Sequence, residues 1–396
     1  MLVERVKLRN FRALRDVDLA LGSRVCVVTG MNGAGKSSFL DAIGLLLGSY
    51  VGVFDDSAQS VPSEADIRRG CDGLPRFPCE IRAEGSFGGL PTEWGCSMAN
   101  KAAIESRLSP YYDAMECRRR LLEGDSELVL PIVARYRVGH AEDGLTMGGT
   151  GEDDRISAYG GFQDARLVDP ASTVWHAGPR YDRLASKAVR DALSDLIGTL
   201  PGLPVAHGEG GCVVGAPCSR LGDGHRAFLD LFGDIACRIA CLNPQLGESA
   251  LLGTHGIVLV DDIGLHMHPR LQQAVLPTLA SAFPKVQFVV TTHSPCVASS
   301  LEGCQVVELS EDGSAHTAPH GLYGRGYESV LREHMATSGR QPEVSAKFGE
   351  FYDFVSDGRL EEAGGVLDGL GDMVGWTDVG VTSCAVELDL AKADWP

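Results

Sequence analysis

Eight residues near the N-terminus, Gly30 to Ser37, combine glycines, a lysine and a hydroxyl at a spacing suited to phosphate chemistry. Their order fits the pattern GxxxxGK[ST]. Glycine has no Cβ, so the backbone can curl tightly and turn its N–H groups toward an anion. Lys36 can reach the β- and γ-phosphates of a nucleotide, and the Ser37 hydroxyl can bind Mg²⁺. We predict nucleotide contacts from Gly30, Asn32, Gly33, Ala34, Gly35, Lys36, Ser37 and Ser38.

The segments on either side of this loop must position it. Val25 to Val28 is a short apolar run typical of a buried strand, and Phe39 to Leu47 has the apolar spacing of a helix. A helix that begins at the loop places partial positive charge where a phosphate would lie. The alternative is a glycine-rich turn with no ligand, which would not require the full spacing or both flanking elements.

Hydrolysis needs more than a phosphate loop, and two later segments could supply it. Asp261 and Asp262 end a β-branched run, and His293 follows the next buried strand. The first carboxylate would hold Mg²⁺, the second would orient the attacking water, and the histidine could hydrogen-bond a γ-phosphate. The alternative is an exposed strand end capped by two acids. The predicted catalytic residues are Lys36, Asp262 and His293, and the predicted metal ligands are Ser37 and Asp261.

Strands and helices alternate around these motifs, which predicts an α/β fold with a largely parallel core sheet. The run Leu128 to Tyr136 is typical of another buried strand. Gly and Pro recur between the phosphate loop and Leu221 without sustained heptads, so a long coiled coil is excluded. Further segments with a helical pattern are about Lys101 to Glu123, Tyr181 to Leu200, Arg226 to Asn243, Pro269 to Ala282 and about Tyr327 to Met373.

Composition narrows the class of protein. The apolar content of 44% and charged content of 22% are ordinary for a globular chain. A net charge of −18 argues against a uniformly basic nucleic-acid binder, although a local basic groove remains open. No apolar run approaches the roughly 18 residues of a membrane span, and no leader is apparent, so we expect a cytoplasmic protein without a membrane partner. The cysteines have no CxxC spacing, and His266 and His268 have no third ligand nearby, so a zinc site is not expected.

Several motifs together resemble the SMC/RecF-like superfamily of ABC-type ATPases. They are VKLRNFRAL before the phosphate loop, LGDGHR at Leu221, VLVDDIGLHMHP around Asp261 and FVVTTHSP around His293. The strand LPIVARYRV, the helix ending in LNP and the segment YGRGYE at Tyr323 resemble, more narrowly, compact ATPases of bacterial antiphage systems. These include the ATPase of Septu and retron-associated ATPases.

The resemblance implies an ABC-type head with Mg²⁺ and ATP as cofactors. In that superfamily two heads sandwich two nucleotides, so it implies a homodimer or higher homo-oligomer. The signature of one head, Gly222, Asp223, Gly224 and His225, would contact the nucleotide of the other. Arg12 would lie near the nucleotide. A nuclease partner, of the HNH type or another, would then act on DNA through the complex.

Three departures from the family pattern bear on hydrolysis. The signature Ser is Gly222, the usual Glu after the metal carboxylate is Asp262, and a second Asp is Gly264. Displacing a catalytic group by ~1 Å can cost on the order of 100-fold in rate. Two alternatives to a DNA-linked ATPase are therefore open: a slow or non-hydrolysing ATP-gated scaffold for a nuclease, and a RecF-like repair ATPase.

The order of the motifs predicts four parts of the chain. Residues 1–100 would form the N-terminal half of the head, and residues 101–215 an inserted helical or irregular lobe. Residues 216–320 would form the C-terminal half of the head, and residues 321–396 a C-terminal helical extension.

Overall fold

A computed structural model gives the fold of the chain in two compact units, Met1–Val330 and Leu331–Pro396. The structure describes residues 1–58, 61–87, 89–100, 103–107, 109–137, 155–162, 195, 198, 205–208, 211–214, 221–335 and 339–394. Within these ranges, no helix combines the length and the apolar character needed to cross a membrane.

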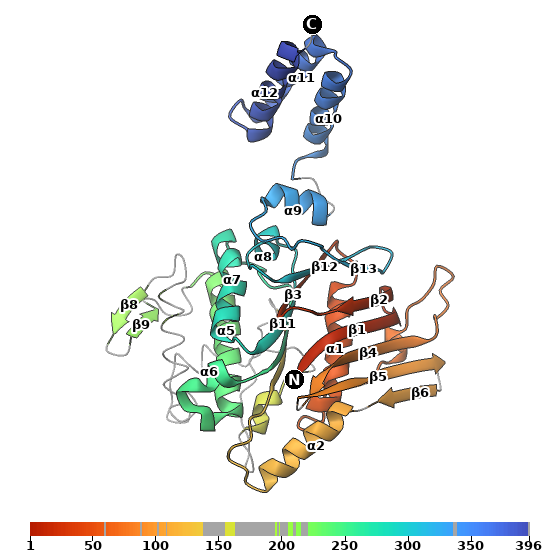
Figure 1. Cartoon of the computed structure of the whole chain (residues 1–396), viewed down its shortest axis with the longest axis vertical. Helices are drawn as coiled ribbons and strands as arrows, with labels where there is room; N and C mark the ends of the chain where they lie inside the picture. The colour runs from red at the N-terminus through yellow and green to blue at the C-terminus, as the bar shows by residue number, and fades with distance from the viewer. Residues whose placement is uncertain are drawn as a thin grey trace. The chain divides into compact units, whose positions relative to one another are not determined.

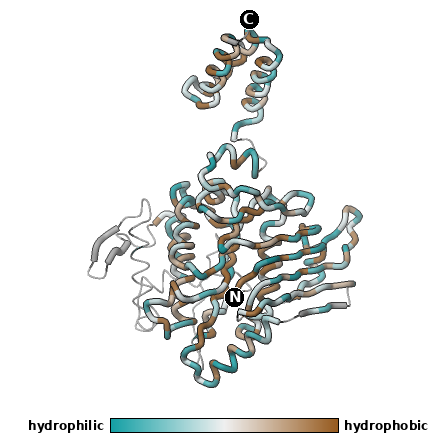
Figure 2. Tube along the Cα trace, viewed as in Figure 1, coloured by the Kyte–Doolittle hydropathy of each residue, from teal (hydrophilic) through white to brown (hydrophobic). Residues whose placement is uncertain are grey.

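A six-stranded sheet forms the centre of the larger unit, in the order β13-β12-β3-β11-β10-β7 (Figure 1). All its neighbours are parallel except the antiparallel pair β12 and β13. β3, β10 and β11 are almost wholly buried and apolar, as expected of parallel strands covered on both faces (Figure 2). The predicted α/β fold is thus confirmed. The strands are β3 (Val25–Gly30), β7 (Ile132–Arg137), β10 (Gly256–Asp261), β11 (Val286–Thr291), β12 (Gln305–Leu309) and β13 (Ala315–Thr317).

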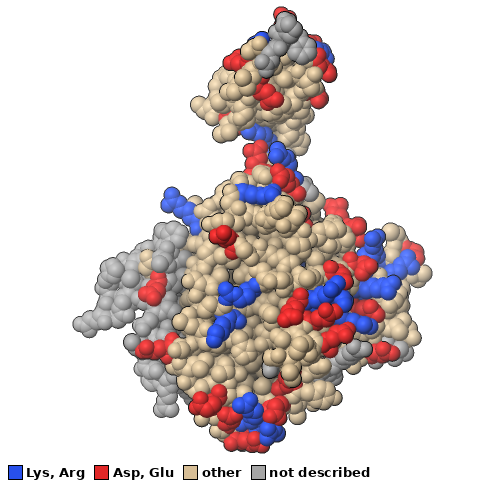
Figure 3. Space-filling view, in the orientation of Figure 1, with Lys and Arg blue, Asp and Glu red and all other residues tan. Residues whose placement is uncertain are grey.

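A second sheet of five antiparallel strands has the order β2-β1-β4-β5-β6. Its strands alternate buried and exposed residues, which is the pattern of a sheet with one face on the core. Acidic and basic side chains are interleaved on this side of the unit (Figure 3), and Arg5–Asp18 and Lys7–Glu84 pair there. The strands are β1 (Leu2–Phe11), β2 (Leu14–Ala20), β4 (Cys79–Phe87), β5 (Leu90–Asn100) and β6 (Ala103–Arg107).

Helix α1 (Lys36–Val51) lies between the two sheets and packs on both. Its apolar residues are not confined to one stripe, and nearly all of its side chains are buried, as expected for a helix covered on every side. The other helices among the described residues before α9 are α2 (Ser109–Leu122), α5 (Asp223–Leu242), α6 (Ala250–Gly253), α7 (Pro269–Ala282), α8 (Pro295–Ala298) and the 3-10 helices η1 (Glu64–Asp66), η2 (Ile156–Tyr159) and η4 (Pro244–Ser249).

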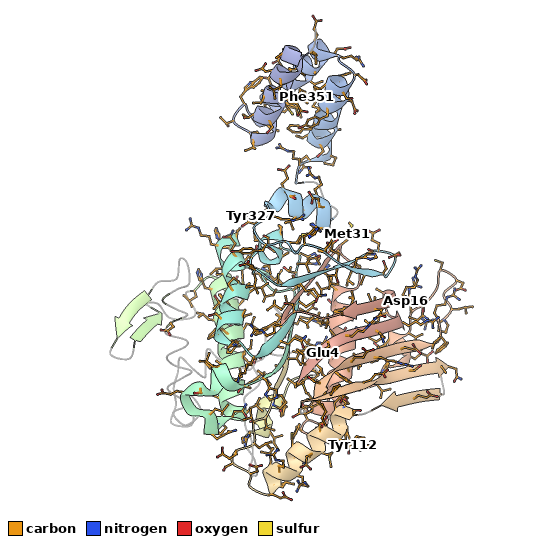
Figure 4. All side chains as sticks on the ribbon, viewed as in Figure 1. Glu4, Asp16, Met31, Tyr112, Tyr327 and Phe351 are labelled. Carbon is orange, nitrogen blue, oxygen red and sulfur yellow. The ribbon has the colours of Figure 1, made fainter. Side chains whose placement is uncertain are left out.

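The described residues of the smaller unit after α9 include the helices α10 (Pro342–Ser356), α11 (Leu360–Val374) and α12 (Val379–Asp394). They share an apolar core that includes Phe351, labelled in Figure 4, and Leu370. Helix α9 (Tyr327–His334) spans the boundary between the units. Residues after Met373 show little pattern in the sequence, yet α12 forms there. Its outward face carries apolar residues as well, which obscures its periodicity.

The structure differs from what the sequence indicated in the middle of the chain. β7 lies within the range 101–215 expected to be an inserted lobe, but it pairs with β10 in the central sheet. The helix expected from about Lys101 begins at Ser109, after β6. The helix expected at Tyr181–Leu200 lies outside the described residues, apart from positions 195 and 198. Strands β8 (Val205–Gly208) and β9 (Gly211–Val214) also fall in this part of the chain and pair antiparallel with each other.

Candidate nucleotide site

Three neighbouring parallel strands bring the predicted catalytic residues to one edge of the central sheet. Lys36 lies just after β3, Asp261 ends β10 and His293 lies just after β11. The order β3-β11-β10 makes these strands neighbours, and parallel strands end at the same edge. Met31 of the phosphate loop, labelled in Figure 4, lies at this edge. The carboxyl edge of an open α/β sheet is where such folds bind ligands.

The phosphate loop passes directly into α1. Gly35 caps the helix in a left-handed conformation, with φ of 101°. A Cβ at this position would also lie 2.9 Å from Cδ2 of Leu14, so the site requires glycine. The ammonium of Lys36 donates hydrogen bonds to the carbonyl oxygens of Gly30, at 2.8 Å, and Met31, at 2.9 Å. The lysine is therefore folded back over the loop whose N–H groups would bind phosphate.

The charged groups at this edge act on one another. Burial lowers the pKa of Lys36, while the charges of Asp262 and Asp261 raise it. Burial and then the Lys36 charge lower the pKa of His293, against the two aspartates. His293 is consequently mostly neutral at pH 7, a state in which one ring nitrogen can donate and the other can accept. The structure thus brings Lys36, Asp261, Asp262 and His293 together.

Residues at the end of β11 hydrogen-bond the segment that carries the two aspartates, and the sequence motifs did not predict these contacts. The hydroxyl of Thr291 donates to Oδ1 of Asp261 and accepts from the N–H of Asp262, both at 2.7 Å. The hydroxyl of Thr292 donates to the carbonyl oxygen of Ile263 at 2.9 Å. The pair of threonines before His293 was visible in the sequence as a hydroxyl signal at a strand end.

Two of the three departures from the family pattern, Asp262 and Gly264, occur where the backbone is left-handed. Asp262 has φ of 58°, in the left-handed region, where Asp and Asn are tolerated better than Glu. Gly264 has φ of 95°, and a Cβ there would lie 2.9 Å from Cγ2 of Val297. An aspartate at position 264 would therefore be strained in this loop. The local backbone accounts for the residue types at both positions.

The oxygen donors at this edge fit Mg²⁺. Ser37 offers a hydroxyl, and Asp261 offers Oδ2, which Thr291 leaves free. Magnesium prefers oxygen ligands and commonly takes one or two from protein, with the rest from phosphates and water. Among the residues that the structure describes, no three His, Cys, Asp or Glu side chains form a group that could hold a metal, so any ion here would take most of its ligands from water or phosphate. His268 instead caps α7, accepting from the N–H of Arg270.

The predicted signature lies at the start of α5. Gly222 caps the helix and accepts hydrogen bonds from the N–H groups of His225 and Arg226. Asp223 is exposed, and Gly224 is buried. A Cβ at Gly224 would lie 2.7 Å from the carbonyl oxygen of His266, so the helix start packs directly on the loop that follows Asp262. Contact with the nucleotide of a second chain stays a prediction.

Arg12 lies in a network of carboxylates. Its Nε donates to Oδ1 of Asp66 at 2.7 Å, and its Nη1 contacts Asp41 of α1. Asp41 also pairs with Arg135 of β7. In this arrangement Arg12 ties the β1–β2 turn to α1, and its predicted contact with nucleotide stays a prediction. The pairing of Asp41 with two arginines was not visible in the sequence, because the three residues are far apart in it.

The fold and the site are those of an α/β chain with a phosphate loop, two aspartates and a histidine at the carboxyl edge of a largely parallel sheet. Two family models match the segments that carry the motifs. Residues 5–73 match "AAA domain", and residues 215–299 match "AAA domain, putative AbiEii toxin, Type IV TA system".

Curated proteins that are similar to this chain include a probable retron ATPase and a Septu protein. "Retron Ec83 probable ATPase" of Escherichia coli is 40% identical over 124 residues, which is 31% of this chain and 22% of the relative. "Septu protein PtuA" of Bacillus mycoides (strain KBAB4) is 44% identical over 92 residues, which is 23% of this chain and 12% of the relative. The matches therefore span less than a quarter of each relative's length. The chain is thus similar, over part of its length, to a probable retron ATPase and to a Septu protein.

Among solved structures, "SMC head domain from Thermotoga maritima" is similar over 81% of this chain and 99% of its own. Its identity is 14% and its TM-score 0.48.

Proposed function

We propose that the chain binds ATP with Mg²⁺, hydrolyses it, and dimerises through its heads in a nucleotide-dependent way. The observation that carries the proposal is the convergence of Lys36, Asp261, Asp262 and His293 at the carboxyl edge of the central sheet. These groups supply a phosphate-binding cation, a metal ligand, a water-orienting carboxylate and a neutral imidazole. A phosphate loop in its strand–loop–helix setting accompanies them.

Each residue has a defined task in this mechanism. The loop N–H groups and Lys36 bind and orient the phosphates, which positions the γ-phosphate for in-line attack. Mg²⁺, when bound, neutralises charge on the β- and γ-phosphate oxygens. Asp262 orients the attacking water, and neutral His293 offers a donor toward the γ-phosphate. Thr291 holds the two aspartates in register with each other.

The likeness to retron and Septu ATPases supports a role in antiphage defence. We propose that the ATPase controls a DNA-directed complex in which a partner nuclease, of the HNH type or another, cuts DNA. The chain has a net charge of −18 and would on average repel DNA, which is also negatively charged. This favours DNA contact through the complex over DNA binding by this chain alone. The signature at Gly222–His225 would complete the site of a second copy.

Steady-state phosphate release tests the assignment directly. We expect Lys36→Ala to abolish release, because the cation that reaches the β- and γ-phosphates is lost. The matched control is Lys7→Ala on the exposed face of β1, which should release phosphate at the wild-type rate. An unchanged rate in Lys36→Ala would overturn the proposed site.

A second candidate is an ATP-gated scaffold that holds a nuclease and hydrolyses slowly or not at all. Gly222, Gly264 and the left-handed Asp262 favour it, since each departs from the family pattern for hydrolysis. Nucleotide content after purification separates the two. Retained ATP with near-zero turnover indicates the scaffold, and retained ADP with steady turnover indicates the enzyme.

A further inference from the structure

Arg137 is the last residue of β7 and lies beside the predicted metal ligand. β7 and β10 are parallel neighbours, and Arg137 and Asp261 are partners in their register. Partners in register direct their side chains to the same face of a sheet, so the fold itself brings the two together. Nε of Arg137 is 3.6 Å from Oδ2 of Asp261.

The two oxygens of Asp261 have different surroundings. Oδ1 accepts the 2.7 Å hydrogen bond from Thr291, which fixes the carboxylate. Oδ2 faces Arg137 across a gap wider than the roughly 2.7–3.2 Å of an N–H···O hydrogen bond. The guanidinium therefore neutralises Oδ2 without a short hydrogen bond. It is held less firmly than a bidentate arginine would be.

Arg135, two residues earlier in the same strand, shows how a structural arginine differs. Its side chain is 10% exposed and pairs with Asp41, whereas the side chain of Arg137 is 43% exposed. Burial, and then the charge of Arg137, lower the pKa of Arg135 to about 10. Arg135 thus belongs to the buried network around Asp41, whereas Arg137 is partly exposed beside Asp261.

We propose that Arg137 pairs with Oδ2 of Asp261, the oxygen that would face the metal, until a divalent cation displaces it. The released guanidinium then donates hydrogen bonds to the nucleotide phosphates. An exposed guanidinium without a short hydrogen bond is a weak competitor for a carboxylate oxygen. Once released, Arg137 remains anchored at the carboxyl edge, where its planar fork of donors suits phosphate oxygens. Only this second step rests on the proposed function, because competition for Asp261 needs no nucleotide.

The first experiment measures Mn²⁺ binding to the nucleotide-free full chain by electron paramagnetic resonance. Removing the competing cation in Arg137→Gln should tighten Mn²⁺ binding roughly twofold to fivefold, given the modest strength of exposed ion pairs. Arg9→Gln is the matched control, since it makes the same charge change at an exposed position on β1. The gain should vanish when Asp261→Asn is added. Unchanged or weaker Mn²⁺ binding in Arg137→Gln would overturn the competition.

The second experiment measures single-turnover ATP cleavage. Loss of a preorganised donor at the phosphates should slow Arg137→Gln on the order of 100-fold, with partial rescue by Arg137→Lys. If Arg137→Gln binds Mn²⁺ more tightly but cleaves ATP at the wild-type rate, the phosphate role is overturned. If the wild type binds no ATP, the proposed function fails, while the Mn²⁺ result still decides the competition for Asp261.

Discussion

Substitution of Asp262 tests whether this shortened carboxylate takes part in hydrolysis. Its N–H is fixed by Thr291 and its backbone is left-handed, so the side chain leaves the loop in a defined direction. Asp262→Asn keeps the shape and the tolerance for this backbone but removes the charge that orients water. Since general-base catalysis contributes about 100- to 10,000-fold, we expect cleavage to slow by roughly 100-fold or more. The ATP affinity should barely change, because Asp261 is untouched.

The opposite substitution, Asp262→Glu, restores the residue usual in the family. It extends the carboxylate by one carbon–carbon bond, about 1.5 Å, which should bring it closer to the attacking water. Its cost falls on stability, on the order of 1 kcal/mol, because Glu lacks the local hydrogen bonding that eases Asp into the left-handed region. We therefore expect Asp262→Glu to cleave ATP fastest, followed by the wild type and then by Asp262→Asn. Asp262→Ala should cleave ATP as slowly as Asp262→Asn, and its ATP-bound dimer should live longer than that of the wild type.

Single-turnover cleavage at saturating ATP is the deciding assay, read beside thermal unfolding of each variant. Asp16→Asn is the control, since it makes the same change at an exposed position on β2, labelled in Figure 4. If Asp262→Asn and Asp262→Ala cleave as fast as the wild type, the carboxylate has no catalytic role. The scaffold would then be the leading function. If Asp262→Glu leaves the rate of ATP cleavage unchanged or lowers it, the rest of the site is adapted to an aspartate at this position.

Two further predictions concern stability. Gly264→Ala should lower the free energy of unfolding by about 1–3 kcal/mol in urea titration. The loss should exceed that of Gly303→Ala, because both glycines have positive φ but, of the two, only Gly264 has a neighbour within 4 Å of the added Cβ. Equal losses in the two variants would show that the side chain of Val297 moves aside without cost. Burial lowers the pKa of His255 to about 4, so protonation favours the unfolded chain as the pH falls from 6.5 toward 4. Between pH 6.5 and 4 the free energy of unfolding of the wild type should therefore fall by up to roughly 3 kcal/mol more than that of His255→Asn. This value is an upper bound, because His255 is not fully buried. Parallel pH profiles of the free energy of unfolding in the two proteins would contradict the prediction.

The sequence predicted most of what lies close together along the chain. The glycine spacing around Lys36 and the carboxylates after Val260 predicted both a nucleotide site and the strands that position it. Contacts between distant segments were not predictable in this way. Asp41, Arg12 and Arg135 meet only because α1 lies between the two sheets, and no local spacing encodes that. The pairing of β7 with β10 likewise depends on sheet order, so its residues were expected in an inserted lobe.

Helix α5 forms a stiff connection across the larger unit. At its start Gly224 leaves no clearance over the carbonyl oxygen of His266. At its end Asn243 makes two 2.8 Å hydrogen bonds to the backbone of Leu130, just before β7. In between, Arg238 donates to the carbonyl oxygens of Ala158 and Gly160. Helix α5 therefore links the loop after Asp262 to the residues just before β7, at the end of that strand opposite to Arg137.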